Sequence, residues 1–319
     1  MSRRIAKAAV LGSGVMGTGI ACHLANIGLE VVMLDIVPFN LPDDKKNDPA
    51  MRNSIVNGAM KAALKGKPAP LYDKKFASRI TTGNFNDDFE KIADCDWIIE
   101  VVVERLDIKQ QIFEKVDALR KEGSLVTSNT SGIPIHMLAE GRSEDFKKNF
   151  CGTHFFNPAR YMRLFEVIPH DGTDPEVVDF WMNYGDVFLG KQSVKCKDTP
   201  AFIANRIGFY TGNKVIELTQ KYNLKIEEVD KLTGAPLGLP NTGSYRLVDL
   251  VGLDTSVKVT KGVVDNCPDD EYAKKVKEDG TPKFIEFLLE NKFLGDKTKQ
   301  GYYKKTNERD EKESVSYWR

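Results

Sequence analysis

The feature that most constrains the fold is a glycine-rich stretch between two apolar runs near the amino terminus. The first run leads into Gly12-Ser-Gly-Val-Met-Gly17, and the second ends at Asp35. Apolar residues recur at helical spacing between them, up to Gly28. Continuous apolar runs are typical of parallel strands that are buried on both faces. The stretch therefore predicts a strand, a helix and a second strand around the three glycines.

Each glycine avoids a clash that a side chain would cause. Gly12 permits the tight turn out of the first strand, Gly14 lets the backbone approach a pyrophosphate, and Gly17 lets the helix pack closely. The first N–H groups of the helix then face the phosphates with the positive end of its dipole. An ordinary tight turn is the alternative interpretation. The strand, helix and strand in register favour a dinucleotide site, to which we also assign Met16.

Asp35 indicates which dinucleotide binds. A carboxylate at the end of the second strand can accept hydrogen bonds from both ribose hydroxyls and would repel a 2′-phosphate. The next residues, Ile36-Val-Pro38, offer no arginine that could receive such a phosphate. The sequence therefore predicts NAD, rather than NADP, as the cofactor.

The composition limits the partners of the chain. Its 319 residues suit about two domains. The 46 basic and 46 acidic residues give zero formal net charge, which provides no general attraction to nucleic acid or to anionic membranes. No apolar run approaches the roughly 20 residues that a membrane-spanning helix needs. We expect neither a nucleic-acid partner nor membrane insertion.

The cysteines and histidines indicate a compartment and argue against a metal centre. The five cysteines are scattered and form no Cys-x-x-Cys pattern, which is typical of reduced residues in an intracellular protein. The first strand is expected to begin near residue 6, which leaves no room for a cleavable leader. We therefore expect a cytoplasmic protein. No histidine pairs with another histidine or a cysteine at ligand spacing, so no structural metal is expected.

A helical insertion near 49–78 interrupts the alternation of strands and helices. Apolar residues at helical spacing between 51 and 64 predict its main helix. Lys61, Lys65 and Lys67 follow on that helix and just beyond it. A solvated helix face is the ordinary interpretation of these lysines. The alternative is a helical arm whose lysines meet a phosphorylated substrate.

From residue 79 onward strands and helices alternate again. We expect strands at 80–82, 96–100 and 124–128, with a helix between the last two. Repeated strand–helix–strand units predict a parallel sheet with right-handed crossovers, whose ligands lie beyond the carboxyl ends of the strands. Two polar segments lie at those ends, Val103-Glu104 and Ser128-Asn-Thr-Ser131.

Two short runs at 150–156 and 163–168 are joined without a helix and are predicted to pair antiparallel. A loop centred on residues 159–161 places His154 opposite Glu166 on one face of the sheet. Glu166 is a lone carboxylate within an apolar run, where an unpaired charge is costly, and an imidazole partner would relieve that cost. A histidine beside aromatic residues is more often a core residue. The facing carboxylate and the sheet edge favour a functional pair instead.

The pattern changes after a last expected strand at 191–195. Asp198-Thr-Pro200 reads as a helix-capping signal, and helices are expected near 200–222, 226–233, 254–265 and 281–291. The predicted fold class is α/β: a Rossmann-type, mostly parallel sheet with added antiparallel strands, followed by a mainly helical C-terminal domain. The predicted domains are an NAD-binding domain at 1–197, which holds the insertion, a helical domain at 198–305, and a polar tail at 306–319.

These motifs occur together in an order that resembles one family, the L-3-hydroxyacyl-CoA dehydrogenases of fatty-acid β-oxidation. The resemblance covers residues 5–303 and rests on the following segments: Leu11–Gly17, Ser128–Ser131, His154-Phe-Phe-Asn-Pro158, Glu166 and Asp198-Thr-Pro-Ala-Phe-Ile-Ala-Asn205-Arg206. It implies NAD-dependent oxidation of (S)-3-hydroxyacyl-CoA to 3-oxoacyl-CoA. It also implies a C-terminal domain that dimerises and an active site between the domains.

The resemblance further implies a role for each matching residue. His154 would be the general base and Glu166 its charge partner. Ser131 and Asn205 would hold the substrate oxygen and orient the reacting carbon. Glu104 and Lys109 would lie near the nicotinamide end of the cofactor.

The chain departs from the family pattern in three places. Arg105 stands where the family often has asparagine, and Gly132 where a second serine is frequent. The segment from Leu239 to Tyr245 replaces the common Met-Gly-Pro-Phe form. These departures resemble dehydrogenase modules of long fusion proteins that also carry an enoyl-CoA hydratase region. We therefore expect either a homodimer or a module of a larger multifunctional enzyme.

Two other functions are compatible with parts of this pattern. One is a related dehydrogenase that oxidises a free hydroxy acid, such as a sugar acid. The other is a protein that binds the cofactor without catalysis. Binding NAD alone requires none of Ser131, His154, Glu166 and Asn205, so their joint presence favours an enzyme.

Overall fold

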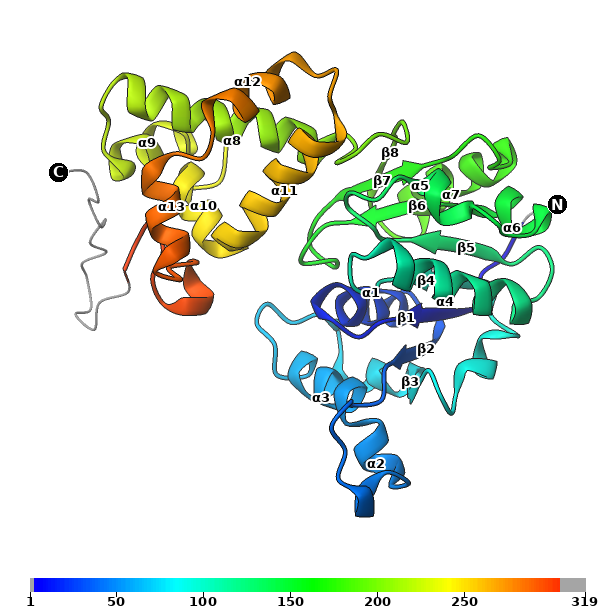
Figure 1. Ribbon diagram of the computed structural model, residues 1–319. Coiled ribbons are helices and arrows are strands. Elements are labelled where there is room, and N and C mark those ends of the chain that lie inside the picture. Colours follow the sequence, from blue (N-terminus) through cyan, green and yellow to red (C-terminus); the bar gives the residue numbers. More distant parts are fainter. Residues whose placement is uncertain (1–2, 305–319) are drawn as a thin grey trace. The chain divides into compact units, whose positions relative to one another are not determined.

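The computed structural model describes residues 3–304, which divide into two compact units (Figure 1). The first unit ends at Phe202 and the second begins at Ile203. Each unit has its own hydrophobic core. The polar tail predicted at 306–319 lies outside the described residues.

The first unit is built on one sheet of eight strands in the order β3-β2-β1-β4-β5-β6-β7-β8. Neighbouring strands from β3 to β6 are parallel, β7 is antiparallel to β6, and β8 is parallel to β7. The order of the first six strands is that of dinucleotide-binding folds. The predicted Rossmann-type sheet with added antiparallel pairing is therefore confirmed. The strands are β1 (Lys7–Leu11), β2 (Glu30–Asp35), β3 (Ile80–Asn84), β4 (Trp97–Glu100), β5 (Leu125–Ser128), β6 (Phe150–Phe155), β7 (Leu164–Ile168) and β8 (Gln192–Lys195).

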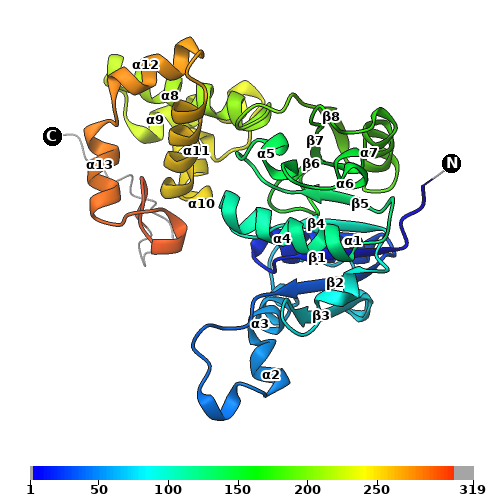
Figure 2. The same ribbon diagram turned by 45° about the vertical axis from the view of Figure 1, so that its right-hand side comes forward.

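Helices cover both faces of this sheet, which explains the continuous apolar runs of its strands (Figure 2). Ala8 and Val10 of β1 belong to the core beneath α1, α3 and α7, whereas Ala9 and Leu11 belong to the core beneath α4, α5 and α6. The helices are α1 (Val15–Asn26), α2 (Pro49–Arg52), α3 (Ser54–Ala63), α4 (Leu106–Leu119), α5 (Ile135–Ala139), α6 (Glu144–Lys148) and α7 (Pro175–Val187).

The predicted insertion is a pair of helices between β2 and β3. Asp48 caps α2 by accepting a hydrogen bond from the amide of Ala50. Helix α3 buries Val56 and Met60 against the core of the first unit. The lysines at 61, 65 and 67 are exposed.

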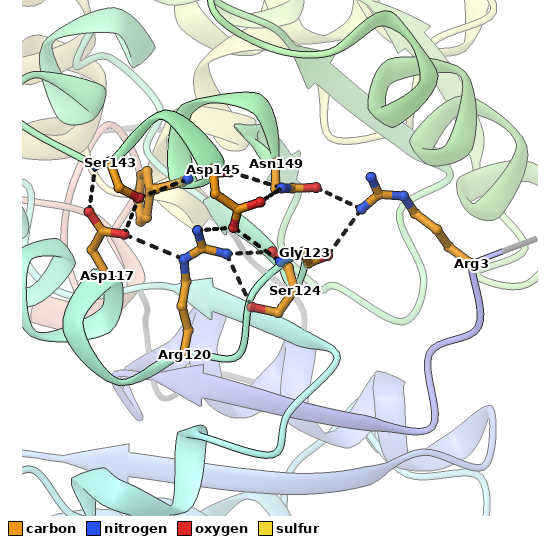
Figure 3. Close-up of polar contacts among 9 residues, drawn as sticks. Arg3, Asp117, Arg120, Gly123, Ser124, Ser143, Asp145 and Asn149 are labelled. Atoms are coloured by element: carbon orange, nitrogen blue, oxygen red, sulfur yellow. Dashed lines mark hydrogen bonds and ion pairs between the residues drawn. The ribbon is translucent and has the colours of Figure 1, made fainter. Parts of the chain in front are cut away.

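A network of polar contacts holds the amino end of β5 (Figure 3). Arg120, just after α4, donates a hydrogen bond to the carbonyl oxygen of Ser124 at 3.2 Å and also binds the carboxylate of Asp145. On the other side, Arg3 donates to the carbonyl oxygen of Gly123 at 3.2 Å and to Asn149 Oδ1 at 2.7 Å. The network joins α4, β5 and α6 at the edge opposite the carboxyl ends of the strands.

The second unit is helical, as predicted, and its core is formed by α9, α10, α11 and α13 together with Tyr302. Among residues 203–304 the helices are α8 (Ala204–Lys221), α9 (Ile226–Leu232), α10 (Gly243–Val251), α11 (Leu253–Asn266), α12 (Glu271–Asp279) and α13 (Lys283–Glu290).

Four of these helices match the expected ones, whereas α10 and α12 were not expected. Helix α10 begins at Gly243 and is capped from a distance, because Asp230 accepts hydrogen bonds from the amides of Tyr245 and Arg246. Helix α12 buries only Ala273, and its ends carry local signals: Asp270 accepts a hydrogen bond from the amide of Ala273 at 2.9 Å, and Gly280 follows its last residue. The signals for α12 are therefore local and were missed, whereas the cap of α10 comes from another helix, α9.

The interpretation of Asp198 as the cap of the first C-terminal helix is wrong. Its carboxylate accepts hydrogen bonds from the amides of Ile135 at 2.6 Å and His136 at 2.8 Å, so it caps α5 in the first unit. Helix α8 begins only at Ala204, after turn residues. A carboxylate can cap any helix start that lies near it in space. The start that Asp198 reaches is that of α5, which is more than sixty residues away in sequence.

Candidate active site

The glycine loop after β1 has the shape that a pyrophosphate requires. Gly12 has a φ of +109°, and a Cβ there would lie 2.6 Å from the carbonyl oxygen of Val101. A Cβ at Gly17 would overlap the carbonyl oxygen of Gly12. A Cβ at Gly14, in contrast, would meet no atom of the protein within 4 Å. Space therefore remains beside Gly14, at the start of α1, where helix N–H groups favour an anion. The loop fits a dinucleotide.

Asp35 lies at the carboxyl end of β2, beside this loop. Its Oδ2 accepts hydrogen bonds from the amide of Ser13 at 2.6 Å and from the hydroxyl of Ser13 at 2.5 Å. Its Oδ1 accepts one from the amide of Ile36 at 2.7 Å. Asp35 thus ties β2 to the glycine loop. Met16, on the first turn of α1, is partly buried and packs against the core.

A buried cluster of charged side chains closes the carboxyl end of β4. Glu100 is fully buried, and its Oε1 accepts hydrogen bonds from Lys109 Nζ at 2.7 Å and the amide of Val102 at 2.6 Å. Its Oε2 accepts a hydrogen bond from the hydroxyl of Ser128 at 2.6 Å. Lys109 is 1% exposed and lies 3.3 Å from Glu104 Oε2. Lys109 therefore bridges the two carboxylates of this segment.

Glu104 holds the loop that carries Ser131. Its Oε1 accepts hydrogen bonds from Thr130 Oγ1 at 2.6 Å and from the amides of Ser131 at 3.0 Å and Gly132 at 3.1 Å. Burial favours a higher pKa for Glu104, but the charge of Lys109 and these hydrogen bonds outweigh it and hold the pKa below its usual range. Glu104 is therefore an anion that orders the backbone around Ser131.

Asn129 joins the ends of β5 and β6. Its Oδ1 accepts a hydrogen bond from the amide of Phe155 at 2.8 Å, next to His154. Each residue of the polar segment at the end of β5 thus has its own partner: Ser128 and Thr130 bind carboxylates, and Asn129 binds the neighbouring strand.

His154 and Glu166 form a hydrogen-bonded pair across β6 and β7. They are direct partners in the antiparallel register, which confirms the register predicted from the loop length. His154 Nδ1 lies 2.7 Å from Glu166 Oε2, and the two residues are 6% and 0% exposed. A carboxylate only accepts, so Nδ1 carries the proton and Nε2 is left with its lone pair. The rings of Phe156 and Phe202 lie 4.4 Å and 5.7 Å from the imidazole, between centroids.

The structure thus gathers most predicted site residues at one edge of the first unit. The glycine loop, Asp35, Glu104, Ser131 and His154 all lie at the carboxyl ends of parallel strands or just beyond them. Asn205 belongs to the first turn of α8 in the second unit, and its role remains a prediction. Arg105, where the family often has asparagine, is exposed and pairs with Asp107 at the start of α4.

Sequence reasoning missed the structural roles of Glu100, Asn129 and Thr130. One signal was present. Lys109 falls on the apolar stripe of α4 with Ile112, Phe113 and Val116, so it had to be buried and to need an anionic partner. Asn129 lies in the polar segment that the sequence places at the end of a strand, but nothing in the sequence indicates that it binds the neighbouring strand.

Comparisons with known proteins agree with this architecture. The family profile described as "3-hydroxyacyl-CoA dehydrogenase, NAD binding domain" matches residues 7–199, and the one described as "3-hydroxyacyl-CoA dehydrogenase, C-terminal domain" matches residues 202–305. The "Probable 3-hydroxyacyl-CoA dehydrogenase" of Bacillus subtilis is 50% identical over 96% of this chain, but the chain spans only 39% of that protein. The protein of the same name in Deinococcus radiodurans is 42% identical over 96% of this chain and 84% of its own length.

A solved structure shows the same fold. The (S)-3-hydroxybutyryl-CoA dehydrogenase PaaH1 from Ralstonia eutropha has a TM-score of 0.73 and 26% identity, covering 93% of this chain and 98% of that one. The chain therefore belongs to the 3-hydroxyacyl-CoA dehydrogenase family, with the NAD-binding domain in its first unit and the family's C-terminal domain in its second.

Proposed function

We propose that the chain catalyses the NAD-dependent oxidation of (S)-3-hydroxyacyl-CoA to 3-oxoacyl-CoA in fatty-acid β-oxidation. The observation that carries this proposal is the buried His154–Glu166 pair at the sheet edge that also holds the glycine loop. Removal of the 3-hydroxyl proton requires a base, and an imidazole whose Nδ1–H is held by a carboxylate presents Nε2 for that purpose. Glu166 then stabilises the imidazolium that forms.

The first unit supplies the residues that would hold the cofactor. Gly12, Gly14 and Gly17 shape the pyrophosphate loop, Met16 follows on α1, and Asp35 would bind the ribose of the adenosine half. When bound, NAD supplies the acceptor for the hydride that leaves the substrate carbon. We assign Glu104 and Lys109 to the nicotinamide end. Glu104 acts there by ordering the loop, and the buried Lys109 acts by holding Glu104.

We assign the substrate oxygen to Ser131 and Asn205. The amide of Ser131 is held by Glu104, and this bond fixes the backbone from which its hydroxyl projects. Asn205, on the first turn of α8, is assigned to the same oxygen because it matches the family motif. The exposed lysines at 61, 65 and 67 are candidates for the phosphates of CoA.

For the assembly we propose either a homodimer formed through the C-terminal domain or a module of a longer enzyme. The Bacillus subtilis relative supports the second possibility, because most of its length lies outside the region that matches this chain. No helix among residues 3–304 combines the length and the apolar character that a bilayer-spanning helix needs. The five cysteines are unlinked, which is compatible with the cytoplasm that we propose.

The proposed reaction is tested by NADH formation from purified protein with short-chain and long-chain (S)-3-hydroxyacyl-CoA and with the corresponding free hydroxy acids. We expect turnover with the CoA thioesters and little with the acids. His154→Gln should lower kcat by about 10²–10⁴-fold while NAD still binds. His170→Gln is the matched control, since this histidine follows β7, lies beside Phe150 at the start of β6 and binds the carbonyl oxygen of Lys147. Turnover of the free acids alone, or normal turnover by the His154 variant, would contradict the proposal.

A further inference from the structure

A buried lysine outside the predicted site holds the loop between the two strands of the His154–Glu166 pair. Lys191 precedes β8 and is 6% exposed. Its ammonium donates hydrogen bonds to the carbonyl oxygens of Ala159 and of Met162, the latter at 2.7 Å, and it lies 3.4 Å from that of Arg160. The carbonyl oxygen of Ala159 thus accepts its hydrogen bond from a lysine outside the loop, which lies just before β8.

A small displacement of this loop would shift His154 and Glu166, because the loop connects the strands that carry them. It joins β6, which carries His154, to β7, which carries Glu166. Its internal hydrogen bonds run from the amides of Tyr161 and Met162 to the single carbonyl oxygen of Pro158. The carbonyl oxygens of Ala159 and Met162, within the same stretch, accept hydrogen bonds from Lys191 instead. The ammonium group therefore holds the loop on the side of β8, while Arg160 and Tyr161 tie it to the carbonyl oxygen of Ala69.

The opposite side of the loop touches the helix that begins at the pyrophosphate loop. A Cβ at Gly19 of α1 would lie 3.6 Å from the Cβ of Ala159, so helix and loop are in close contact. One turn later, His23 Nε2 donates a hydrogen bond to the carbonyl oxygen of Leu189 at 3.0 Å, close in sequence to Lys191. Three parts of the chain converge here: α1, the β6–β7 loop and the turn before β8.

A lysine at this position has a cost and a use. Burial of a cation is unfavourable unless it is well hydrogen-bonded, and an apolar side chain of similar size fills space at lower cost. A lysine is useful where several carbonyl oxygens must be held at one point, because its ammonium offers three donors.

We infer that Lys191 is a positioning residue of the proposed reaction: its ammonium fixes the β6–β7 loop against α1 and so fixes His154 relative to the dinucleotide loop. The inference rests on the proposed function. It predicts that loss of the ammonium lowers kcat, with little effect on the binding of NAD to the free enzyme.

Burial also lowers the pKa of the Lys191 ammonium to about 8. The ionisable groups beside it are His23 on α1 and Arg160 in the loop. The pKa of His23 is lowered to about 4 and guanidinium groups do not deprotonate, so neither changes charge near pH 8. As the pH rises through about 8, the lysine loses its charge and one of its three donors. The activity of the wild-type enzyme should therefore fall on the alkaline side.

The test compares Lys191→Met with Lys195→Met, which alters an exposed lysine on the adjoining strand. Turnover with a 3-hydroxyacyl-CoA, NAD affinity and kcat as a function of pH are measured for both variants and for the wild type. We expect kcat of Lys191→Met to fall by about 10–100-fold, the scale of a small misplacement of a reacting group. Its NAD affinity should stay near that of the wild type, and its alkaline decrease should disappear. Lys195→Met should behave as the wild type.

The outcomes separate this inference from the proposed function. A wild-type protein that binds NAD but oxidises no 3-hydroxyacyl-CoA overturns the proposed function. Normal turnover of Lys191→Met beside an active wild type overturns only the role of Lys191. If Lys191→Met does not fold, the wild-type pH profile decides: a decrease above about pH 8 supports the inference, and a plateau up to about pH 10 contradicts it.

Discussion

At the residue scale, the proposed chemistry depends on one hydrogen bond between an imidazole and a carboxylate. The 2.7 Å contact from His154 Nδ1 to Glu166 leaves only one tautomer in which Nε2 can accept a proton. A neutral amide in place of the carboxylate can donate to Nδ1 as well as accept from it. The tautomer would then no longer be specified.

Glu166→Gln should therefore lower kcat by about 10²-fold or more without abolishing NAD binding. Glu166→Gln added to His154→Gln should reduce kcat little further, because without the imidazole the carboxylate has no base to orient. Steady-state kinetics of the single and double variants check this expectation. Glu176→Gln, in the exposed first turn of α7, is the matched control. Additive losses in the double variant would show that the two residues act independently.

Asp35 is the residue that should decide between NAD and NADP. Asp35→Ala removes both the ribose acceptor and the charge that repels a 2′-phosphate, so NAD affinity should fall and the preference over NADP should narrow. Ser13→Ala separates the two effects, because it deletes the hydroxyl bond to Asp35 and keeps the carboxylate. Titration with both dinucleotides gives the affinity ratios. An unchanged ratio in Asp35→Ala would exclude the proposed contact.

At the element scale, the start of α1 is shaped by glycines with different structural requirements. The fold itself requires glycine at positions 12 and 17, since a Cβ at either position would collide with backbone atoms. The fold does not require glycine at position 14, because a Cβ there would point into open space. Its requirement comes from the ligand rather than from folding.

Gly14→Ala should consequently leave the free energy of unfolding within about 0.5 kcal/mol of the wild type, as surface substitutions usually do. It should weaken NAD binding by about tenfold or more, because the methyl group occupies the space of the pyrophosphate. Urea unfolding and NAD titration measure the two effects. Gly212→Ala, in the open middle of α8, serves as the control and should bind NAD normally. Strong NAD binding by Gly14→Ala would argue against a pyrophosphate at this loop.

Elements were predictable to different degrees. The hairpin register followed from the sequence because a short loop leaves few alternatives and a shift by one residue would exchange the two faces of the strand. The cap of α5 did not, because Asp198 reaches that helix across more than sixty residues of chain. The same holds for α10, whose cap comes from Asp230.

At the scale of the whole molecule, a buried neutral histidine makes stability depend on pH. Burial, together with the charge of Lys191, lowers the pKa of His23 from 6.5 to about 4. Below pH 6.5 His23 is protonated in the unfolded chain, whereas in the folded protein it stays neutral down to about pH 4. The free energy of unfolding should therefore decrease as the pH falls through this window, by about 3 kcal/mol in total.

His23→Gln keeps a side-chain amide that can donate to the carbonyl oxygen of Leu189 but lacks the titrating group. Its free energy of unfolding should fall less steeply than that of the wild type between about pH 6.5 and pH 4. Urea unfolding of both proteins at several pH values checks this. The contributions of the other titrating groups cancel when the free energies of unfolding of the two proteins are subtracted. Parallel curves for the two proteins would show that His23 does not titrate in this window.

The sequence by itself determined the features that depend on local order. The glycine motif, the alternation of strands and helices, the helical character of the second unit and the facing positions of His154 and Glu166 all follow from periodicity and turn length over short stretches. Such patterns reflect which side of a helix or strand is buried, and the spacing of apolar residues within a short stretch is enough to show it.

Only the tertiary structure decided which distant residues meet. The sheet order places Glu100 beside Ser128, Glu104 beside Ser131, and Lys191 against the β6–β7 loop. These contacts satisfy buried charges and backbone groups whose partners can come from any strand that lies nearby. A sequence shows that a buried lysine needs acceptors, but only the path of the chain in space shows which ones it finds.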